Sequence, residues 1–452
     1  MDPLTLTEIA EMAGARVLKA GDALITSVSK DSRTAGPGDL YVALRGANFD
    51  GNDFAADALA RGAAAVLVDS TDTASRLDGP VLLAEDGRSS LQRLAGAWRQ
   101  KLLLKAVGIT GSSGKTSTKE FAAGVLGTRY RVVKTAGNLN NHIGVPLSIL
   151  AASKADRAAV WEVGMNHAGE IAPLAALCRP DIAIITNIGV AHIENLGSRD
   201  AIAVEKGSLA EAVGPRGVVI LSADDDKSDS IACRCRARVV RTGISGGQIS
   251  AASMVESDTG CHFDVIHEGD RFPARIPANG EHMVRNALLA LAAGLEMDVP
   301  LEEGISGLAG THLASGRQQR RNVGGVIFLD DTYNANPDSM EAALKMLRAL
   351  PGAGRRIAVL GMMGELGSYA AEGYERTGRA AAVGADILVT VGREAAAAAA
   401  AARAAGLGRI HEVADTASAA LMLKNLARPG DLVLVKGSRA ARMEAVIEHF
   451  QG

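Results

Sequence analysis

Apolar residues along this chain gather in short runs, which alternate with longer stretches where apolar positions recur every three or four residues. Short apolar runs predict buried parallel strands, and the longer stretches predict helices that cover both faces of a sheet. The pattern divides the chain into residues 1–84, 85–312 and 313–452. We therefore predict an α/β protein with three domains.

The first block predicts a small α/β unit, with a helix capped by Thr7, a helix over 53–61 and a strand at 63–68. The middle block contains the strand sequences VGIT, AVWEVG, DIAIITN and GVVIL, separated by helical stretches. This order is typical of a mostly parallel sheet. Within it, residues 248–278 alternate apolar and polar positions, which predicts an antiparallel insertion.

The third block repeats strand and helix from RRIAVLG to a last helix that ends near Phe450. We expect a Rossmann-like domain from this repetition. An alanine run that begins at Ala395 predicts a helix, because alanine is the best helix former. The segment 361–367 lacks the second glycine of a dinucleotide fingerprint, so we predict a ligand-facing loop of another kind.

The composition of the chain excludes some classes of binding partner. A net charge of −3 and 3% aromatic residues do not suit nucleic-acid binding, which needs basic surfaces and stacking side chains. The cysteines form no Cys-x-x-Cys pair, and the N-terminus has no export signal. We expect small-molecule substrates, reduced thiols, no nucleic acid, no membrane span, a cytoplasmic location and a monomer.

The sequence after the strand VGIT predicts a phosphate cradle, formed by Gly111, Ser112, Ser113, Gly114, Lys115, Thr116 and Ser117. Glycines let backbone N–H groups turn toward an anion, and the following helix adds the positive end of its dipole. Lys115 would offset charge on the outer phosphates, and the Thr116 hydroxyl suits Mg²⁺. A GTPase would share this loop, but the chain has no Asn-Lys-x-Asp segment to read guanine.

Polar residues follow the ends of the next strands. Glu162 interrupts an apolar strand, and a buried carboxylate needs a partner or a metal ion, so we predict a magnesium ligand. His192 lies after the next strand, at the edge where α/β sheets bind ligands, and is as well explained by a metal as by a hydrogen-bonded histidine. Lys206, judged from its helix alone, is a solvated lysine.

A second polar group lies beyond residue 312. Arg317 could bind a phosphate with both arms of its guanidinium group. The segment 330–337 follows the strand VIFL and carries carboxylates and amides that could hold ribose hydroxyls, a purine edge or ammonium groups. It could also be a turn that caps a helix beginning at Pro337, and both interpretations can hold together.

Seven segments resemble the Mur ligase family, in order and across nearly the whole chain: TGSSGKTS, TAGNLNNHIGVP, EVGMNHAGEI, NIGVAHIENLGS, GEHMVRNALLA, DDTYNANPDSM and VKGSRAARME. The second, sixth and seventh are similar to the member that handles D-alanyl-D-alanine. The resemblance implies an ATP-dependent amide ligase of peptidoglycan precursor synthesis. It would join D-alanyl-D-alanine to UDP-N-acetylmuramoyl-tripeptide through an acyl phosphate.

The resemblance also implies roles for individual residues. Catalysis would depend on Lys115, Glu162, His192 and Lys206. Two Mg²⁺ ions would be held by Thr116, Glu162, His192 and Lys206, the last as a carbamylated lysine. ATP would contact the cradle with His282, Asn286, Arg317, Asp331, Asn334 and Asn336. The UDP end would contact Ser29, Asp31, Ser32, Arg33 and Arg45, the sugar-peptide Asn138 and Asn141, and the dipeptide Glu365, Lys436 and Ser438.

The chain departs from the family pattern at Asn52, Ser208, Met283, Met362 and Met363. None of these positions is a predicted phosphate or magnesium contact. Two other functions stay open at this point. A folylpolyglutamate synthase would lack the first block, and a catalytically silent scaffold would lose Lys115, Glu162 or His192, all of which are present.

Overall fold

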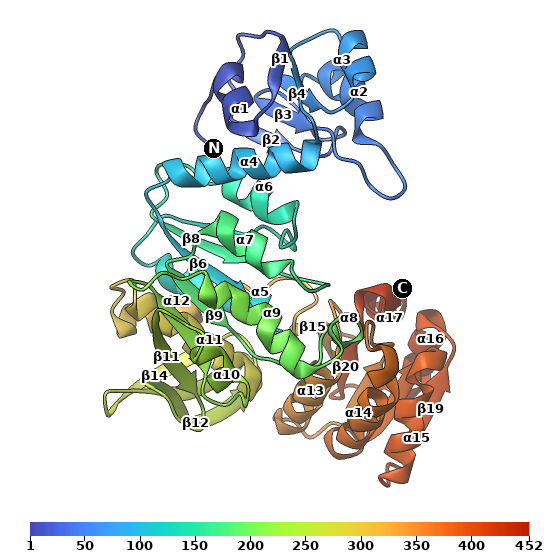
Figure 1. The fold of residues 1–452 in the computed structure, drawn as a ribbon. Coiled ribbons are helices and arrows are strands. Elements are labelled where there is room, and N and C mark those ends of the chain that lie inside the picture. The colour runs from blue at the N-terminus through green and yellow to red at the C-terminus, as the bar shows by residue number, and fades with distance from the viewer. Residues whose placement is uncertain (452) are drawn as a thin grey trace.

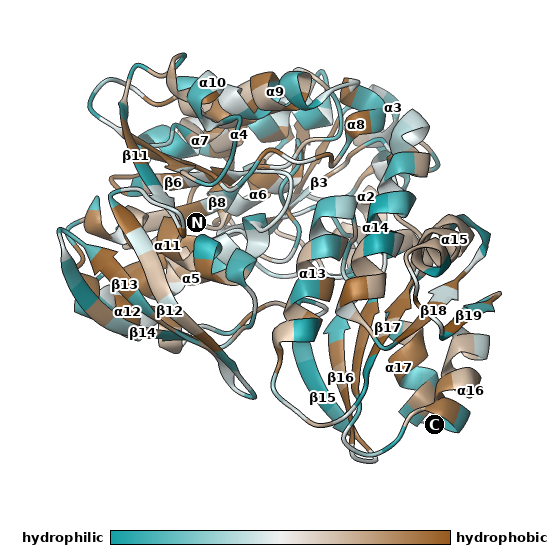
Figure 2. Cartoon of the chain, turned by 90° about the horizontal axis from the view of Figure 1, so that it is seen from below, coloured by the Kyte–Doolittle hydropathy of each residue, from teal (hydrophilic) through white to brown (hydrophobic). Residues whose placement is uncertain are grey.

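The computed structural model describes residues 1–451, which form three α/β units that follow one another in chain order (Figure 1). Each unit is built on its own sheet, and the predicted α/β class is confirmed. The sheets have five, nine and six strands. Helices cover the sheets, with apolar residues along central strands such as β17 and polar residues on the edge strand β15 (Figure 2).

The first unit has the strand order β1-β5-β4-β3-β2, with β1 antiparallel to its neighbour. Its strands are β1 (Arg16–Lys19), β2 (Ser27–Ser29), β3 (Asp39–Val42), β4 (Ala65–Val68) and β5 (Val81–Leu83). Its helices are α1 (Leu6–Ala13), the 3₁₀ turn η1 (Gly51–Phe54), α2 (Ala55–Ala60) and α3 (Thr71–Arg76), and α4 (Gly87–Lys101) leads to the next unit.

The predicted cap of the first helix is wrong by two residues. Thr5, not Thr7, is the N-cap, because Thr5 has extended backbone angles and its side chain accepts from the N–H of Glu8. Glu8 returns the bond to the Thr5 backbone, which completes a capping box. The helix expected over 53–61 begins earlier, as the 3₁₀ turn η1, and continues as α2.

The central unit has the order β14-β13-β12-β11-β10-β9-β6-β8-β7. Its strands are β6 (Lys105–Thr110), β7 (Val132–Lys134), β8 (Ala158–Glu162), β9 (Ile182–Ile185), β10 (Val218–Ser222), β11 (Arg238–Gly243), β12 (Ile249–Ser257), β13 (Gly260–His267) and β14 (Asp270–Ile276). The strands from β7 to β12 pair in parallel, and β12, β13 and β14 pair antiparallel, which confirms the predicted insertion.

Helices of the central unit place its functional loops at the carboxyl ends of the parallel strands. They are α5 (Lys115–Leu126), α6 (Gly144–Leu150), α7 (Ile171–Cys178), α8 (Ile193–Leu196), α9 (Arg199–Glu211), α10 (Ser228–Ala232), α11 (Glu281–Leu295) and α12 (Leu301–Ala309). The loops after β6, β8 and β9 therefore meet at one edge of the sheet, where open α/β sheets bind ligands.

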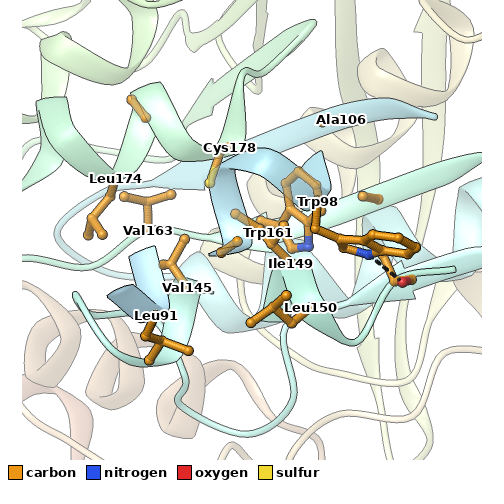
Figure 3. Packing of buried hydrophobic residues seen from close by; sticks show 14 of the residues in the cluster. Leu91, Trp98, Ala106, Val145, Ile149, Leu150, Trp161, Val163, Leu174 and Cys178 are labelled. Carbon is orange, nitrogen blue, oxygen red and sulfur yellow. Dashed lines mark hydrogen bonds between the residues drawn. The ribbon is translucent and has the colours of Figure 1, made fainter. Parts of the chain in front are cut away.

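A continuous apolar core joins the first and central units. Leu91 and Trp98 of α4 lie in it with residues of both sheets. Figure 3 shows the part of this core where α4 packs against α6. The indole of Trp98 donates to the carbonyl oxygen of Ala152 at 2.9 Å, so its one polar group is bonded. The guanidinium of Arg99 stacks on the ring of Trp161, 5.4 Å from its centre. This packing fixes the first unit on the central one.

The third unit has the order β15-β16-β20-β17-β18-β19 and cores of its own, formed from Val326 onward. Its strands are β15 (Gln319–Val323), β16 (Val326–Asp331), β17 (Arg356–Leu360), β18 (Ile387–Val391), β19 (Ile410–Val413) and β20 (Leu432–Lys436). Its helical segments are α13 (Pro337–Ala349), η2 (Gly367–Tyr369), α14 (Ala370–Gly384), η3 (Arg393–Ala395), α15 (Ala396–Ala404), α16 (Thr416–Leu426), η4 (Arg439–Ala441) and α17 (Glu444–Gln451).

The predicted alanine helix is confirmed as α15. Across residues 1–451, every helix is too short or too polar to cross a lipid bilayer.

Candidate active site

A polar cavity of about 1140 Å³ lies between the central and third units. Residues from β8, the loop after β9, α11 and the linker before β15 line it together with the predicted phosphate cradle. It brings together these predicted site residues: Ser112, Ser113, Gly114, Lys115, Thr116, Ser117, Asn138, Asn141, Glu162, His192, His282, Asn286, Arg317, Asp331, Asn334, Asn336 and Lys436. Gly111, Lys206, Glu365 and Ser438 do not line this cavity, nor do the predicted residues of the first unit.

The cradle requires its two glycines. Gly111 has φ +151°, and a Cβ atom there would lie 1.8 Å from the Thr186 hydroxyl oxygen. Gly114 has φ +81°, and its Cβ would lie 2.5 Å from an amide atom of Asn286. Asn187 fixes the loop between them, because its side chain accepts from the Ser113 N–H at 3.0 Å and donates to the Ser113 carbonyl oxygen at 3.1 Å.

The start of α5 is suited to an anion. Its N-cap is Gly114, which has no side chain to accept from the first N–H groups of the helix. Lys115 follows and donates to the Gly111 carbonyl oxygen at 2.8 Å. Burial lowers the pKa of Lys115, and the nearby Glu162 carboxylate opposes that shift. The cradle therefore presents N–H groups and an amine on one side of the cavity.

Glu162, at the end of β8, is almost fully buried and has both oxygens bonded. One accepts from the Thr116 hydroxyl at 2.8 Å, and the other accepts from the Asn140 amide at 2.8 Å. Arg317 of the linker donates to the same Thr116 hydroxyl at 2.9 Å. A hydroxyl and a carboxylate side by side are the oxygen ligands that Mg²⁺ prefers. Thr116 and Glu162 therefore fit the predicted metal site.

His192 lies at the junction of two units. It has a left-handed φ of +65°, and its Nδ1 contacts the carboxylate of Glu365. The hydrogen bond from His192 lowers the pKa of Glu365. The loop 361–367, which was predicted to face a ligand, has residues in two different surroundings. Met363 is buried in the third unit, whereas Glu365 contacts His192 of the central unit. Within residues 1–451, no three His, Cys, Asp or Glu side chains are grouped as a metal site.

Lys206 is not solvated, which corrects the interpretation from its helix alone. Its side chain on α9 is 1% exposed, because the helix turns this residue inward with Ile202 and Leu209. Burial and the positive charge of Lys115 lower the pKa of Lys206 well below its ordinary value. This shift favours the neutral amine, which is the form of lysine that can act as a nucleophile.

A second part of the cavity is formed by α11, the linker and the end of β16. Burial lowers the pKa of His282 to about 4, and the Gln318 amide lies 2.7 Å from its Nε2. The guanidinium of Arg317 lies 4.2 Å from the ring centre of Tyr333. These contacts place a neutral histidine and a stacked arginine in the cavity, and the arginine also reaches the cradle at Thr116.

The segment after β16 caps a helix, as predicted, and its residues also line the cavity. Asn336 caps α13 through Ser339, and its amide also donates to the Ser113 hydroxyl at 3.1 Å. Lys436, expected at the dipeptide end, donates to Asp331 at 2.6 Å and to the Asn334 carbonyl oxygen at 3.0 Å. The turn therefore belongs to the third unit and contacts the cradle of the central unit.

The residues predicted for UDP lie on the first unit, away from the cavity. Arg33 pairs with Asp31 at 2.7 Å, and Arg45 pairs with Asp69 at 2.9 Å. Both arginines are exposed. Asn52, one of the departures from the family pattern, donates to the same Asp69 oxygen at 2.7 Å.

Sequence reasoning missed two residues that bond to the site. Asn140 lies between the chosen Asn138 and Asn141 and is the one whose amide reaches Glu162. Asp338, in the first turn of α13, accepts from the Val190 N–H at 2.8 Å and from Arg376 at 2.9 Å. The asparagine-rich run was a signal for the first, whereas a carboxylate in a first helical turn is too common to reveal the second.

Comparison with known proteins gives a consistent result along the chain. The Mur ligase family catalytic domain matches residues 24–94, the Mur ligase middle domain matches 109–294, and the Mur ligase glutamate ligase domain matches 316–439. A relative from Bacillus subtilis, named UDP-N-acetylmuramoyl-tripeptide--D-alanyl-D-alanine ligase, is 34% identical over 98% of this chain and 97% of its own length.

Solved structures show the same likeness. A crystal structure of MurF from Acinetobacter baumannii superimposes with a TM-score of 0.91 at 32% identity, covering 100% of this chain and 99% of that one. The MurF ligase from Thermotoga maritima, crystallised with ADP, gives a TM-score of 0.83 at 29% identity, covering 94% of this chain and 97% of its own.

Proposed function

We propose, from the premise that this chain belongs to the Mur ligase family, that it joins D-alanyl-D-alanine to UDP-N-acetylmuramoyl-tripeptide with ATP. The observation that carries the proposal is the meeting of Lys115, Thr116, Glu162 and Arg317 at one glycine loop, in a chain that matches ligases of this name over its full length. This site combines residues of the central unit with Arg317 of the linker to the third unit, so it can hold substrates that bind to different units.

The proposed reaction has two steps. An oxygen of the tripeptide's terminal carboxylate attacks the γ-phosphorus of ATP, the bond to ADP breaks, and an acyl phosphate forms. The amine of D-alanyl-D-alanine then attacks the acyl carbon, loses a proton and displaces phosphate, which leaves an amide. Lys115 and Arg317 offset the negative charge that moves between phosphate oxygens, and the cradle holds those oxygens in line.

Thr116, Glu162 and His192 would hold Mg²⁺, and Lys206 would support the second of two ions. Bound Mg²⁺ supplies positive charge beside the phosphate oxygens. Glu162 suits this role because its carboxylate is already fixed by Thr116 and Asn140. Lys206 would act as a carbamate, since a neutral amine is the form that adds CO₂, and its burial favours that form.

The remaining substrate contacts complete the proposal. ATP lies between the cradle and the group His282, Asn286, Arg317, Asp331, Asn334 and Asn336. The UDP end lies at Ser29, Asp31, Ser32, Arg33 and Arg45, the sugar-peptide at Asn138 and Asn141, and the dipeptide at Glu365, Lys436 and Ser438. We place domain boundaries near residues 84 and 312. Because both nucleotide substrates belong to the cytoplasm, we propose that the enzyme acts there, as a monomer.

Phosphate release from ATP tests the reaction. We expect release that requires both UDP-N-acetylmuramoyl-tripeptide and D-alanyl-D-alanine, together with a UDP-linked pentapeptide detected by mass. Tripeptides that end in meso-diaminopimelate and in lysine are assayed in parallel. If neither tripeptide supports phosphate release, the proposal is contradicted. Turnover of folate with glutamate would instead identify a folylpolyglutamate synthase.

A further inference from the structure

Lys119 is a buried cation that the proposed reaction does not use. It lies on α5, one helical turn after Lys115, and its side chain is 1% exposed. Burial of an ammonium group is costly unless the protein supplies hydrogen bonds and opposite charge. Its neighbours therefore indicate why it is kept inside.

The Lys119 ammonium group contacts one loop and two carboxylates. It donates to the carbonyl oxygen of Thr135 at 2.9 Å and to that of Gly137 at 3.4 Å. It lies 3.1 Å from a Glu120 oxygen and 4.0 Å from the Glu162 oxygen that accepts from Thr116. Lys119 thus joins the proposed magnesium ligand to the backbone of the loop formed by residues 135–141.

The 135–141 loop is itself bonded to Glu162 on two sides. The Thr135 hydroxyl accepts from the Glu162 N–H at 3.0 Å, and the Asn140 amide donates to the Glu162 carboxylate at 2.8 Å. The Asn140 carbonyl oxygen accepts from the Gly164 N–H at 2.8 Å. Asn138 and Asn141, the proposed sugar-peptide contacts, belong to this loop and line the cavity.

We propose that Lys119 is a positioning residue that holds Glu162 and the 135–141 loop in one arrangement, so that the phosphate end and the sugar-peptide end of the site form together. This inference rests on the proposed function. Lys119 acts through its neighbours, since the carbonyl oxygens of the loop and the carboxylate of Glu162 share its single ammonium group. Without that charge, the loop loses its inner support while the cradle keeps its own bonds.

The test compares Lys119→Met with Lys134→Met in the phosphate-release assay. Lys134 is the matched control because it pairs with the same Glu120, yet its side chain is 45% exposed. For Lys119→Met we expect the KM for UDP-N-acetylmuramoyl-tripeptide to rise about 10- to 100-fold, as for other supporting contacts of a metal site. The KM for ATP rises less, because the cradle keeps its own bonds, and Lys134→Met matches the wild type.

Two further measurements separate positioning from simple loss of folding. Calorimetric titration of the UDP-linked tripeptide, without ATP, should show the same loss of affinity in Lys119→Met. Thr135→Val removes the hydroxyl that accepts from the Glu162 N–H, so we expect a smaller effect in the same direction that is not additive with Lys119→Met. If Lys119→Met does not fold, Thr135→Val alone tests the proposal.

Equal changes in both KM values, or tripeptide affinity that stays at the wild-type level in folded variants, would overturn the proposal. An inactive wild-type enzyme would instead count against the proposed function.

Discussion

Arg317 and Arg45 are both proposed to meet a nucleotide, yet they lie in opposite surroundings. Arg317 lies in the cavity, where it stacks on Tyr333 and donates to Thr116. Arg45 lies on the first unit with 57% of its side chain exposed, and it pairs with carboxylates of its own unit. The interior arginine is fixed before substrate arrives, whereas the exposed one can exchange a weak surface pair for a ligand.

The difference suggests that Arg317 acts in the reaction and that Arg45 acts in substrate binding. Charges in a low-dielectric cavity act strongly on phosphate oxygens, and they need no reorganisation when they are already positioned. Charges at the surface are screened by water and salt, so they contribute affinity in small amounts. We therefore expect substitutions in the cavity to change turnover and substitutions on the first unit to change substrate affinity.

Lys115→Ala should give the largest effect. It removes the amine at the cradle, and we expect kcat/KM to fall on the order of 10³-fold, as when a positioned group that stabilises transition-state charge is lost. The phosphate-release assay measures it. Lys105→Ala is the control, because Lys105 is exposed at the start of β6. A loss below about tenfold would place Lys115 outside the reaction centre.

Lys206→Met should lower activity by about 10²-fold, if Lys206 supports a metal ion as a carbamate. We expect a carbamate signal in the wild type after exchange with ¹³C-bicarbonate, and none in the variant. Lys424→Met, at an exposed position of α16, should keep both the activity and the signal.

The same variant should be more stable in CO₂-free buffer at pH 7. The pKa of Lys206 is lowered in the folded state, so the unfolded chain binds a proton that the folded chain releases. The unmodified amine therefore costs stability as pH falls below its unfolded pKa, and methionine removes that cost. A lower thermal midpoint for the variant under these conditions would contradict the interpretation.

Arg45→Ala tests whether the exposed arginine of the first unit contributes to substrate affinity. We expect the KM for the UDP-linked substrate to rise about tenfold, as for the loss of one charged hydrogen bond, with kcat and thermal stability unchanged. Arg76→Ala serves as the control, since Arg76 forms a similar exposed pair with Asp72 in the same unit. A fall in kcat with no change in KM would mean that the first unit takes part in the chemistry.

Apart from its proposed contact with ATP, His282 should have a small, pH-dependent effect on stability, which His282→Gln should reduce. The folded pKa of about 4 lies below the ordinary value of 6.5. The unfolded histidine takes up its proton first, so wild-type stability is lost as pH falls from 6.5 toward 4. Urea unfolding at pH 7 and pH 5 should show a smaller difference for the variant. His262→Gln, at an exposed position of β13, should retain the wild-type difference.

Local sequence patterns predicted structure correctly where a single segment determines its own conformation. The strand of residues 105–110, the glycines of the cradle and the alanine run of α15 fold as their own residues dictate. They failed at Thr7, because Thr5 two positions earlier can complete a capping box with Glu8. They also failed at Lys206, because a helix pattern shows which positions share a face but not how deeply that face is covered.

The sequence by itself determined the α/β class, the three sheets in order and the glycine loop after β6, since periodicity and glycine positions are local properties. Only the tertiary structure decided that Arg317 reaches Thr116 from 201 residues away, that His192 meets Glu365, and that Asn140 bonds to Glu162 while Lys119 lies 4.0 Å from it. Such contacts depend on how separate units pack, and burial then sets the charge state of the groups they enclose.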